Sequence, residues 1–364
     1  MERRSCINLT VAGKQKKTFK GGNTANMNVL VTGASGFVGI DLTKKLLDEG
    51  YTVYALVRDK KKLVRGLTPN YLDRVTVLEG NLLVESDLKD LEHELQGMSC
   101  NLDMVLDLAG GGPLTANNKV ESFDTNFKTT SNLVRILENS KKLSSVQLFV
   151  YYSSLAAMGL PKAAGDQIPY NESTTCNPVL PLERGKLESE AFLKDLANKH
   201  GFKTVALRFP QIYGLADAAF MQIVSLIRKG IFPVVRGRIG SLPLINLRDV
   251  VKSTYAVVRN VDSIQGNYSV YLVCEGSYSY NHLALLVEKK YGQGGVLRMP
   301  FWFMYLGVWM LEVVFGLLQR PEPLNRRRLV SLTKDRIVDS SKFVNAFNFK
   351  FEENVERFIA SELS

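Results

Sequence analysis

The sequence predicts an α/β fold, a doubly wound parallel sheet with a smaller C-terminal lobe. Three observations predict it. Short apolar runs alternate with longer helical stretches as far as residue 210. A glycine-rich turn joins the first apolar run to the first helical stretch, and beyond residue 210 the alternation loosens. Runs that are apolar on both faces and alternate with helices are typical of parallel βαβ units.

Each element has its own local signal. The predicted strands are short runs rich in Val, Leu and aromatic residues, at 28–32, 52–57, 75–78, 103–108, 146–152 and 204–207. The predicted helices show apolar residues at helical spacing or open at an N-cap residue, and lie at 37–49, from 86 onward, at 121–139 and at 182–200. Beyond residue 210, we expect short strands at 242–246 and 268–273 and helices at 249–259 and 280–291.

This pattern divides the chain into three regions. Residues 1–26 carry six basic residues and one acidic residue without apolar periodicity, so we expect a disordered basic leader. No apolar stretch follows its arginines, which argues against a secretory signal. Residues 27–210 are expected to bind a dinucleotide. Residues 211–364 are expected to form a substrate lobe and to add part of the main sheet.

Composition excludes several classes of protein. With 45% apolar and 23% charged residues among 364, and a mean hydropathy of −0.03, the chain is not a polytopic membrane protein. Its four cysteines share no short spacing and its three histidines pair with no other ligand. We therefore expect no disulfide scaffold, no metal site and a reducing, cytoplasmic location. Half of the formal charge of +10 lies in the leader, so we expect no nucleic-acid partner.

The glycine-rich turn is the first functional signal. Gly33, Gly36 and Gly39 follow the first predicted strand and open the first predicted helix. Glycines at these positions would permit a tight turn, the approach of a pyrophosphate to the helix N-terminus, and close packing of helix against strand. The spacing therefore predicts a dinucleotide site of the Rossmann type.

Four segments, in this order, resemble motifs of the extended short-chain dehydrogenases/reductases, the NAD-dependent epimerase/dehydratase family. They read TGASGFVG at 32–39, DMVLDLAG at 103–110, YSSLAAMG at 152–159 and LRFPQIYG at 207–214. Asp107 stands where the family usually has a histidine, and Asn126 falls in the helix that usually holds a structural asparagine. The C-terminal part is similar in hydropathy to the 3β-hydroxysteroid and sterol dehydrogenase branch. The resemblance implies a Rossmann-type fold and a nicotinamide cofactor.

The resemblance also implies which residues hold that cofactor. Arg58 follows the second predicted strand, where it could meet a 2′-phosphate, so we favour NADP(H) over NAD(H). The alternative is that Asp59 binds the ribose hydroxyl. Asn81 stands where the family usually has an aspartate that contacts adenine. The expected cofactor-binding residues are Gly33, Ser35, Gly36, Phe37, Val38, Gly39, Arg58, Asn81, Leu82, Ala109, Lys186 and Pro210.

The catalytic motif of the family is incomplete in this chain. The family uses a serine and a YxxxK pair, whose tyrosine exchanges a proton with the substrate and whose lysine lowers the pKa of the tyrosine. Ser154 and Lys186 match, but Leu182 occupies the tyrosine position. Glu183 shares a helix face with Lys186 and is the first candidate for a replacement base. The other candidates are Tyr152 and Tyr213. A first-turn acid and packed aromatic rings are the structural interpretations of these three residues.

An apolar segment runs from Phe301 to Leu318 with one charged residue, Glu312. Its length is the lower limit for a membrane-spanning helix, and Glu312 argues against spanning. Trp302 and Trp309 share a helix face, and arginines stand on both sides of the segment. Two interpretations are left open: a helix that lies at a membrane interface, and an apolar lid over a substrate pocket.

The sequence thus predicts an NAD(P)-dependent oxidoreductase that acts on a C–OH or C=O group of a hydrophobic, sterol- or isoprenoid-like substrate. One alternative is a sugar-nucleotide epimerase or dehydratase, against which the apolar segment argues. Another is a cofactor-binding scaffold or redox sensor with weak catalysis, which Leu182 favours. The expected partners are a small hydrophobic molecule and a membrane surface. The oligomeric state, a homodimer included, is left open.

Overall fold

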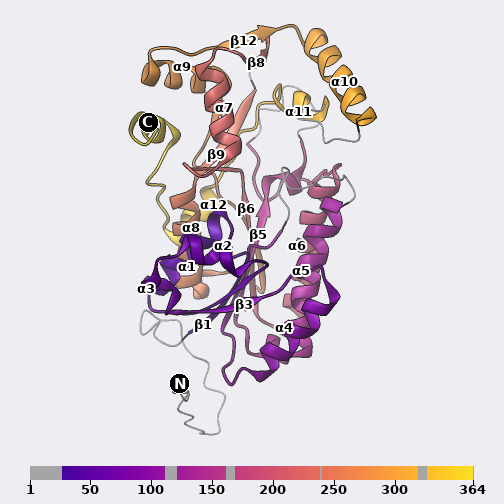
Figure 1. The fold of residues 1–364 in the computed structure, drawn as a ribbon, viewed down its shortest axis with the longest axis vertical. Coiled ribbons are helices and arrows are strands. Elements are labelled where there is room, and N and C mark those ends of the chain that lie inside the picture. The colour runs from indigo at the N-terminus through magenta and orange to yellow at the C-terminus, as the bar shows by residue number, and fades with distance from the viewer. Residues whose placement is uncertain (1–26, 111–120, 161–168, 238–239, 319–325, 364) are drawn as a thin grey trace.

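The computed structural model of the chain describes residues 27–110, 121–160, 169–237, 240–318 and 326–363 (Figure 1). A sheet with helices on both faces occupies the lower half of the view, and a lobe of shorter elements lies above it. The predicted leader at 1–26 lies outside the described residues.

The central sheet has seven strands in the order β10-β6-β5-β4-β1-β2-β3, all parallel. The order reverses between β1 and β4, as it does in doubly wound sheets. The predicted fold class is therefore confirmed. The strands are β1 (Asn28–Thr32), β2 (Thr52–Val57), β3 (Val75–Glu79), β4 (Met104–Asp107), β5 (Leu148–Ser154), β6 (Lys203–Phe209) and β10 (Tyr268–Leu272).

Helices bury both faces of this sheet, which is why its strands are apolar throughout. Val29 and Val31 of β1 point into one hydrophobic cluster, whereas Leu30 points into the other. The first cluster contains side chains of α1 (Phe37–Asp48), α8 (Leu247–Arg259) and α12 (Ser341–Phe347). The second contains side chains of α4 (Glu85–Gly97), α5 (Glu121–Asn139) and α6 (Pro181–His200).

The lobe has two small sheets and a core of its own. The rings of Tyr213, Phe220 and Phe358 meet in this core with centroids 5.0 to 6.1 Å apart. One sheet is β11-β9-β7 and the other is β12-β8. The strands are β7 (Gln211–Tyr213), β8 (Phe232–Val235), β9 (Ser241–Asn246), β11 (Gly276–Ser279) and β12 (Val296–Met299). The helices are α7 (Ala218–Arg228), α9 (Tyr280–Tyr291), α10 (Phe301–Leu317), α11 (Arg326–Ser331) and α13 (Val355–Ser361).

Several short elements are absent from the sequence prediction. The side chain of Asp59 caps one of them, α2 (Lys60–Gly66), and Pro69 opens the next, α3 (Pro69–Leu72). Neither helix is long enough to show an apolar period. The unpredicted strands β7, β8, β11 and β12 have three or four residues each. The unpredicted helices and helical turns are α2 (Lys60–Gly66), α3 (Pro69–Leu72), η1 (Leu143–Ser145), η2 (Leu155–Met158), α7, η3 (Val261–Ser263), α11, α12 and α13.

The apolar segment forms α10, which lies at the upper right of Figure 1. Among the residues that the structure describes, we find no helix with both the length and the apolar character that crossing a membrane requires.

Candidate cofactor and catalytic site

The carboxyl ends of four neighbouring strands meet at one edge of the central sheet. These strands end in Thr32 (β1), Asp107 (β4), Ser154 (β5) and Phe209 (β6). Open parallel sheets bind ligands at this edge, next to the point where the strand order reverses. The glycine turn and the other predicted motifs directly follow these strand ends, so the fold gathers them on one side of the sheet.

The glycine turn has the geometry of an anion site. Gly33 has a φ of +65°, and the N–H of Gly36 donates to its carbonyl at 2.8 Å. No side chain of the described residues caps the start of α1 at Gly36. Its first-turn N–H groups can therefore face an anion. A Cβ at Gly39 would lie 2.2 Å from the carbonyl oxygen of Gly33, so helix and turn pack too closely for a side chain. Ser35, Phe37 and Val38 are half-buried around this turn. These features fit the pyrophosphate of a dinucleotide.

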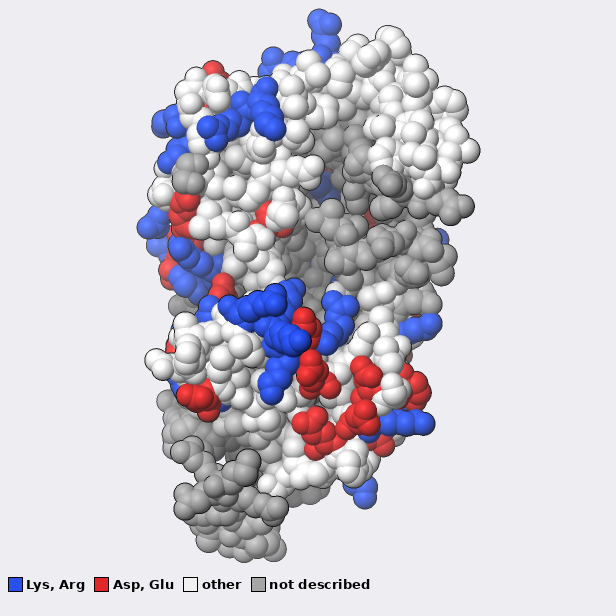
Figure 2. Space-filling model, viewed as in Figure 1, with Lys and Arg blue, Asp and Glu red and all other residues white. Residues whose placement is uncertain are grey.

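A hollow at the end of β2 is lined mainly by basic side chains. Figure 2 shows lysines and arginines, with a few acids among them, gathered over α2 in the middle of this face. Asp59 accepts a hydrogen bond from the N–H of Lys61, and Glu79 accepts one from the N–H of Lys60, both at 2.9 Å. Arg58 is exposed beside them. The hollow is lined by Arg58, Asp59, Lys60, Lys61, Val64, Arg65 and Glu79.

Three further predicted contact residues lie in loops at the same edge. Asn81 follows β3 and accepts a hydrogen bond from the N–H of Leu83 at 3.1 Å. Leu82 is buried next to it. Ala109 follows β4, and its N–H donates to Oγ1 of Thr32 at 2.9 Å. The structure therefore places these three predicted cofactor-binding residues near the carboxyl ends of the strands.

Asp107 is a buried acid at the end of β4. Thr32 donates to one of its carboxyl oxygens at 2.6 Å, and Thr130 of α5 donates to the other at 2.8 Å. Burial raises the pKa of Asp107, while these two hydroxyls and the charge of Lys186 oppose the rise. The carboxyl group joins β1, β4 and α5, and it places an acid under the site where the family usually has a histidine.

Lys186 reaches from α6 to the end of β5. Its Nζ donates to the backbone oxygen of Tyr152 at 2.7 Å and lies 4.9 Å from the ring centroid of Tyr151. A Cβ built on Gly110, after β4, would lie 3.4 Å from the same Nζ. Burial lowers the pKa of Lys186 to about 8, against the opposing charges of Asp107 and Glu190. The site therefore contains an amine that can gain or lose a proton near neutral pH.

Ser154 and Leu182 both precede this lysine in the chain, at the end of β5 and in the first turn of α6. Ser154 is half-buried at the start of η2, and its Oγ accepts a hydrogen bond from the N–H of Ala156 at 3.1 Å. Lys186 binds the carbonyl two residues before Ser154, so the structure brings the two polar candidates to one strand end. Leu182 is half-buried in the first turn of α6.

Glu183 is occupied by a structural contact. Its carboxylate accepts hydrogen bonds from the N–H groups of Val179 and Leu180 at 2.8 and 3.0 Å. This contact caps the N-terminus of α6, which agrees with the structural interpretation of a first-turn acid. A role for Glu183 as a base stays a prediction.

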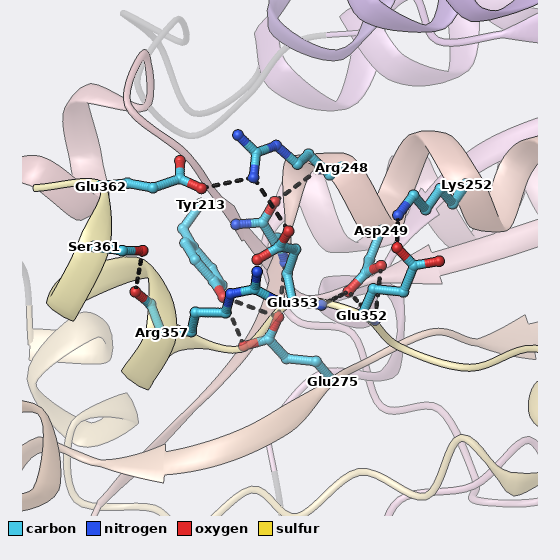
Figure 3. A network of polar contacts seen from close by, with 11 residues as sticks. Tyr213, Arg248, Asp249, Lys252, Glu275, Glu352, Glu353, Arg357, Ser361 and Glu362 are labelled. Atoms are coloured by element: carbon cyan, nitrogen blue, oxygen red, sulfur yellow. Dashed lines mark hydrogen bonds and ion pairs between the residues drawn. The ribbon is translucent and has the colours of Figure 1, made fainter.

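The two candidate tyrosines also have structural partners. The hydroxyl of Tyr152 is hydrogen-bonded to that of Thr254 in α8, and burial raises the pKa of Tyr152. The hydroxyl of Tyr213 donates to the two carboxylate oxygens of Glu275 at 2.9 and 3.0 Å (Figure 3). Both rings lie in hydrophobic clusters, so both agree with the interpretation as packed aromatics.

A buried ion pair under the site was not predicted as such. Arg208 at the end of β6 donates to the two carboxylate oxygens of Glu190 in α6 at 2.9 and 2.6 Å. The hydroxyl of Ser153 donates to the same carboxylate, so β5, β6 and α6 are joined. The available signal was a single arginine within the apolar run 205–209 of β6, since a buried charge requires a partner.

Comparisons with known proteins agree with this geometry. Residues 29–273 match the sequence profile described as the NAD dependent epimerase/dehydratase family. The chain belongs to this family. The expected resemblance is thereby confirmed. Membership places the protein among NAD(P)-dependent oxidoreductases and epimerases, which use a nicotinamide dinucleotide cofactor.

Relatives of the chain include two dehydrogenases with steroid or sterol names. One is the sterol-4-alpha-carboxylate 3-dehydrogenase, decarboxylating, of Dictyostelium discoideum. It is 25% identical over 328 residues, which are 86% of this chain and 91% of that protein. The other is a 3-beta-hydroxysteroid dehydrogenase of Mycolicibacterium neoaurum. It is 28% identical over 201 residues, which are 54% of this chain and 50% of that protein. The second match therefore spans about half the length of the relative.

Solved structures share the fold at lower identity. A UDP-glucose 4-epimerase from Thermotoga maritima, crystallised with UDP-glucose, superposes with a TM-score of 0.68 and 17% sequence identity. The match covers 92% of this chain and 96% of that one. At this identity the likeness establishes the fold alone.

Proposed function

We propose that this family member is an NADP(H)-dependent oxidoreductase of a hydrophobic, sterol- or isoprenoid-like molecule, acting at a C–OH or C=O group. The observation that carries the proposal is Lys186, an amine with a pKa of about 8 at the strand ends where the cofactor belongs. The sterol name of the relative that covers most of this chain supports the substrate class. The family's sugar-nucleotide activities are the second candidate, which the UDP-glucose 4-epimerases among the relatives favour.

The basic hollow supports the choice of NADP(H). Asp59 would have to bind a ribose 2′-OH in an NAD enzyme, but its carboxylate caps α2. Glu79 is similarly engaged with the start of α2. Arg58, with a permanent charge, is exposed at this position and suits a 2′-phosphate, which it would bind by charge-assisted hydrogen bonds. When bound, the nicotinamide supplies the hydride chemistry.

The protein's own task is to handle a proton at the substrate oxygen. The N–H of Ala156 occupies a lone pair of the Ser154 hydroxyl, which leaves the O–H free to donate to that oxygen. Lys186 is held by the carbonyl of Tyr152 and can give its proton as an ammonium or take one as an amine. In this proposal Lys186 fills the role of the tyrosine that Leu182 replaces.

The test is the pH dependence of turnover. The purified protein is assayed by NADPH absorbance with keto- and hydroxysteroids and with isoprenoid alcohols. Reduction needs the ammonium form, so its kcat/KM should fall as the pH rises through about 8. Oxidation needs the amine, so its kcat/KM should rise through the same pH.

Variants separate this role from a merely structural one. Lys186→Arg should remove the pH limb near 8, because a guanidinium keeps its proton. Lys142→Met is the matched control, because Lys142 is also a buried lysine that donates to backbone carbonyls, at 2.7 and 2.9 Å. The Lys142→Met variant should change stability and leave the pH dependence of turnover near pH 8 unchanged.

NADPH binding without turnover, together with turnover gained in Leu182→Tyr, would favour the scaffold alternative. Turnover of a UDP-sugar alone would favour the epimerase alternative.

For location, we propose peripheral membrane association through α10. The exposure of this helix supports the interface interpretation of the apolar segment over the lid interpretation.

A further inference from the structure

The outer side of α10 is exposed and apolar along its whole length. Trp302 is 67% exposed, Trp309 46% and Leu317 80%. Only one narrow stripe packs inward, where Met304 and Val308 are buried. The exposed large hydrophobic residues of the helix and its C-cap are Trp302, Phe303, Tyr305, Leu306, Trp309, Met310, Leu311, Val313, Val314, Leu317 and Leu318. Soluble monomers rarely expose a continuous apolar surface of this kind without a binding role.

The single acid of α10 does not interrupt this surface. Glu312 is half-buried, and its carboxylate accepts hydrogen bonds from the backbone N–H and the Nε of Arg326 at 2.8 and 2.7 Å. Its charge is therefore neutralised at the side of the helix that carries α11. The outer side presents no ionised group of the described residues.

Basic side chains lie near the N-terminus of α10. Arg298 lies in β12, directly before α10, and the N–H of Arg236 donates to the carbonyl of Met299 at 2.9 Å. Figure 2 shows blue atoms over α7, α9 and β12 at the same end of the molecule as the broad white surface of α10. The exposed basic residues of these elements and their adjoining loops, here called the basic cluster, are Arg228, Lys229, Arg236, Lys289 and Arg298.

The apolar surface of α10 and the basic residues beside it distinguish between two binding partners for this surface. A second copy of the chain, docked about a two-fold axis through α10, would bring two like-charged clusters together, which is unfavourable. An anionic bilayer would take up the apolar side chains in its interface and attract every basic side chain beside them. Tryptophan and tyrosine on the exposed side suit the headgroup region.

We propose that α10, together with the basic cluster of α7, α9, β12 and their adjoining loops, docks the protein on the surface of an anionic lipid bilayer. The helix lies in the interface with its outer side toward the acyl chains, and the lobe faces the membrane. A hydrophobic substrate would then reach the lobe from the lipid. The docking itself does not depend on the proposed chemistry, and its test measures binding and not turnover, so either can fail alone.

The two tryptophans of the chain are both in α10, so tryptophan emission reports on this helix alone. The full-length protein is mixed with vesicles of phosphatidylcholine containing 30% phosphatidylglycerol, with pure phosphatidylcholine vesicles, and with buffer. We expect a blue shift of the emission and co-flotation with the anionic vesicles at low salt. At about 0.5 M salt the apparent affinity for the anionic vesicles should fall at least tenfold, because the Debye length becomes short.

Matched variants test the surface. Leu306→Ser and Leu317→Ser should each reduce binding several-fold, whereas Leu83→Ser, which changes an exposed leucine just before α4, should not. Arg236→Gln combined with Arg298→Gln should reduce the salt dependence. Equal binding to neutral vesicles at all salt concentrations would overturn the electrostatic part of the proposal. A blue shift that grows with protein concentration without lipid, with a dimer in analytical ultracentrifugation, would identify a second copy as the occupant.

Discussion

Glu275, which follows β10, is a buried carboxyl group whose protonation should set the pH dependence of stability. Its oxygens accept a hydrogen bond from the hydroxyl of Tyr213 at 2.9 Å (Figure 3). They also accept one from the N–H of Asn246 at 2.9 Å and one from the hydroxyl of Tyr278 at 3.4 Å. Burial raises the pKa of Glu275 from 4.5 to about 7, and the charge of Asp249 adds to the rise, while the hydrogen bonds from Tyr213 and Asn246 oppose it.

The direction in which stability changes with pH follows from the linkage between protonation and folding. The folded state prefers the protonated acid, so this contribution to stability is complete below the unfolded pKa and is lost as the pH rises through about 7. The full loss is ~3 kcal/mol at about 1.4 kcal/mol per pKa unit. Between about pH 5.5 and 8.5 the loss is ~2 kcal/mol. Glu275→Gln removes the titration, so the variant should gain ~2 kcal/mol on the unmodified protein across this interval.

Urea unfolding at the two pH values, followed by circular dichroism, measures the difference. Tyr213→Phe provides a second test, because it removes a hydrogen bond that lowers the pKa of Glu275. The loss of stability with pH should therefore occur at a higher pH in this variant. A difference between Glu275→Gln and the unmodified protein that is the same at both pH values would refute the reasoning.

Three further predictions follow from the site. Arg58→Ala should reduce the preference for NADPH over NADH by ~10- to 100-fold, since a charge-assisted contact contributes about 1.5–3 kcal/mol; calorimetric titration with both cofactors measures it, and unchanged affinities would contradict it. Arg208→Leu should cost about 3–5 kcal/mol in the free energy of unfolding, because it leaves the Glu190 carboxylate buried without its guanidinium; denaturant unfolding checks this. Gly39→Ala should abolish cofactor binding, because its Cβ would lie 2.2 Å from a carbonyl oxygen, whereas Gly97→Ala, with open space around it, should be tolerated; thermal shift with and without NADPH compares the two.

The sheet and the glycine turn were predictable because their signals are local. A strand buried on both faces is apolar throughout, and the turn after β1 requires glycine at positions adjacent in the chain. Lys186 was predictable from its motif, but its low pKa was not, because burial is a property of the assembled fold. The position of Glu183 as a first-turn acid of α6 was predictable as well, because that signal is local, whereas its capping hydrogen bonds to Val179 and Leu180 were not.

The lobe was less predictable because its contacts are distant in sequence. Glu275 meets a tyrosine from β7, and Asp249 at the start of α8 accepts hydrogen bonds from the N–H groups of Glu352 and Glu353. No short-range pattern links these residues, and strands of three or four residues show no alternation to read. The same reason explains why the sequence predicts that residues 211–364 add part of the main sheet, and predicts a strand near Tyr268, but does not identify that strand as the edge strand β10.

The path of the chain between sheet and lobe limits how the protein can move. After β6 the chain enters the lobe, returns to cover the sheet with α8 and to add β10, leaves again for β11, returns as α12 and ends its described part in α13. Two bodies joined by so many connections cannot swing about a single hinge. Local displacement of loops or of α10 is therefore the movement that we expect when a bulky substrate enters. Sheet and lobe should also unfold in one cooperative transition, with similar hydrogen-exchange protection in β10 and in the lobe core.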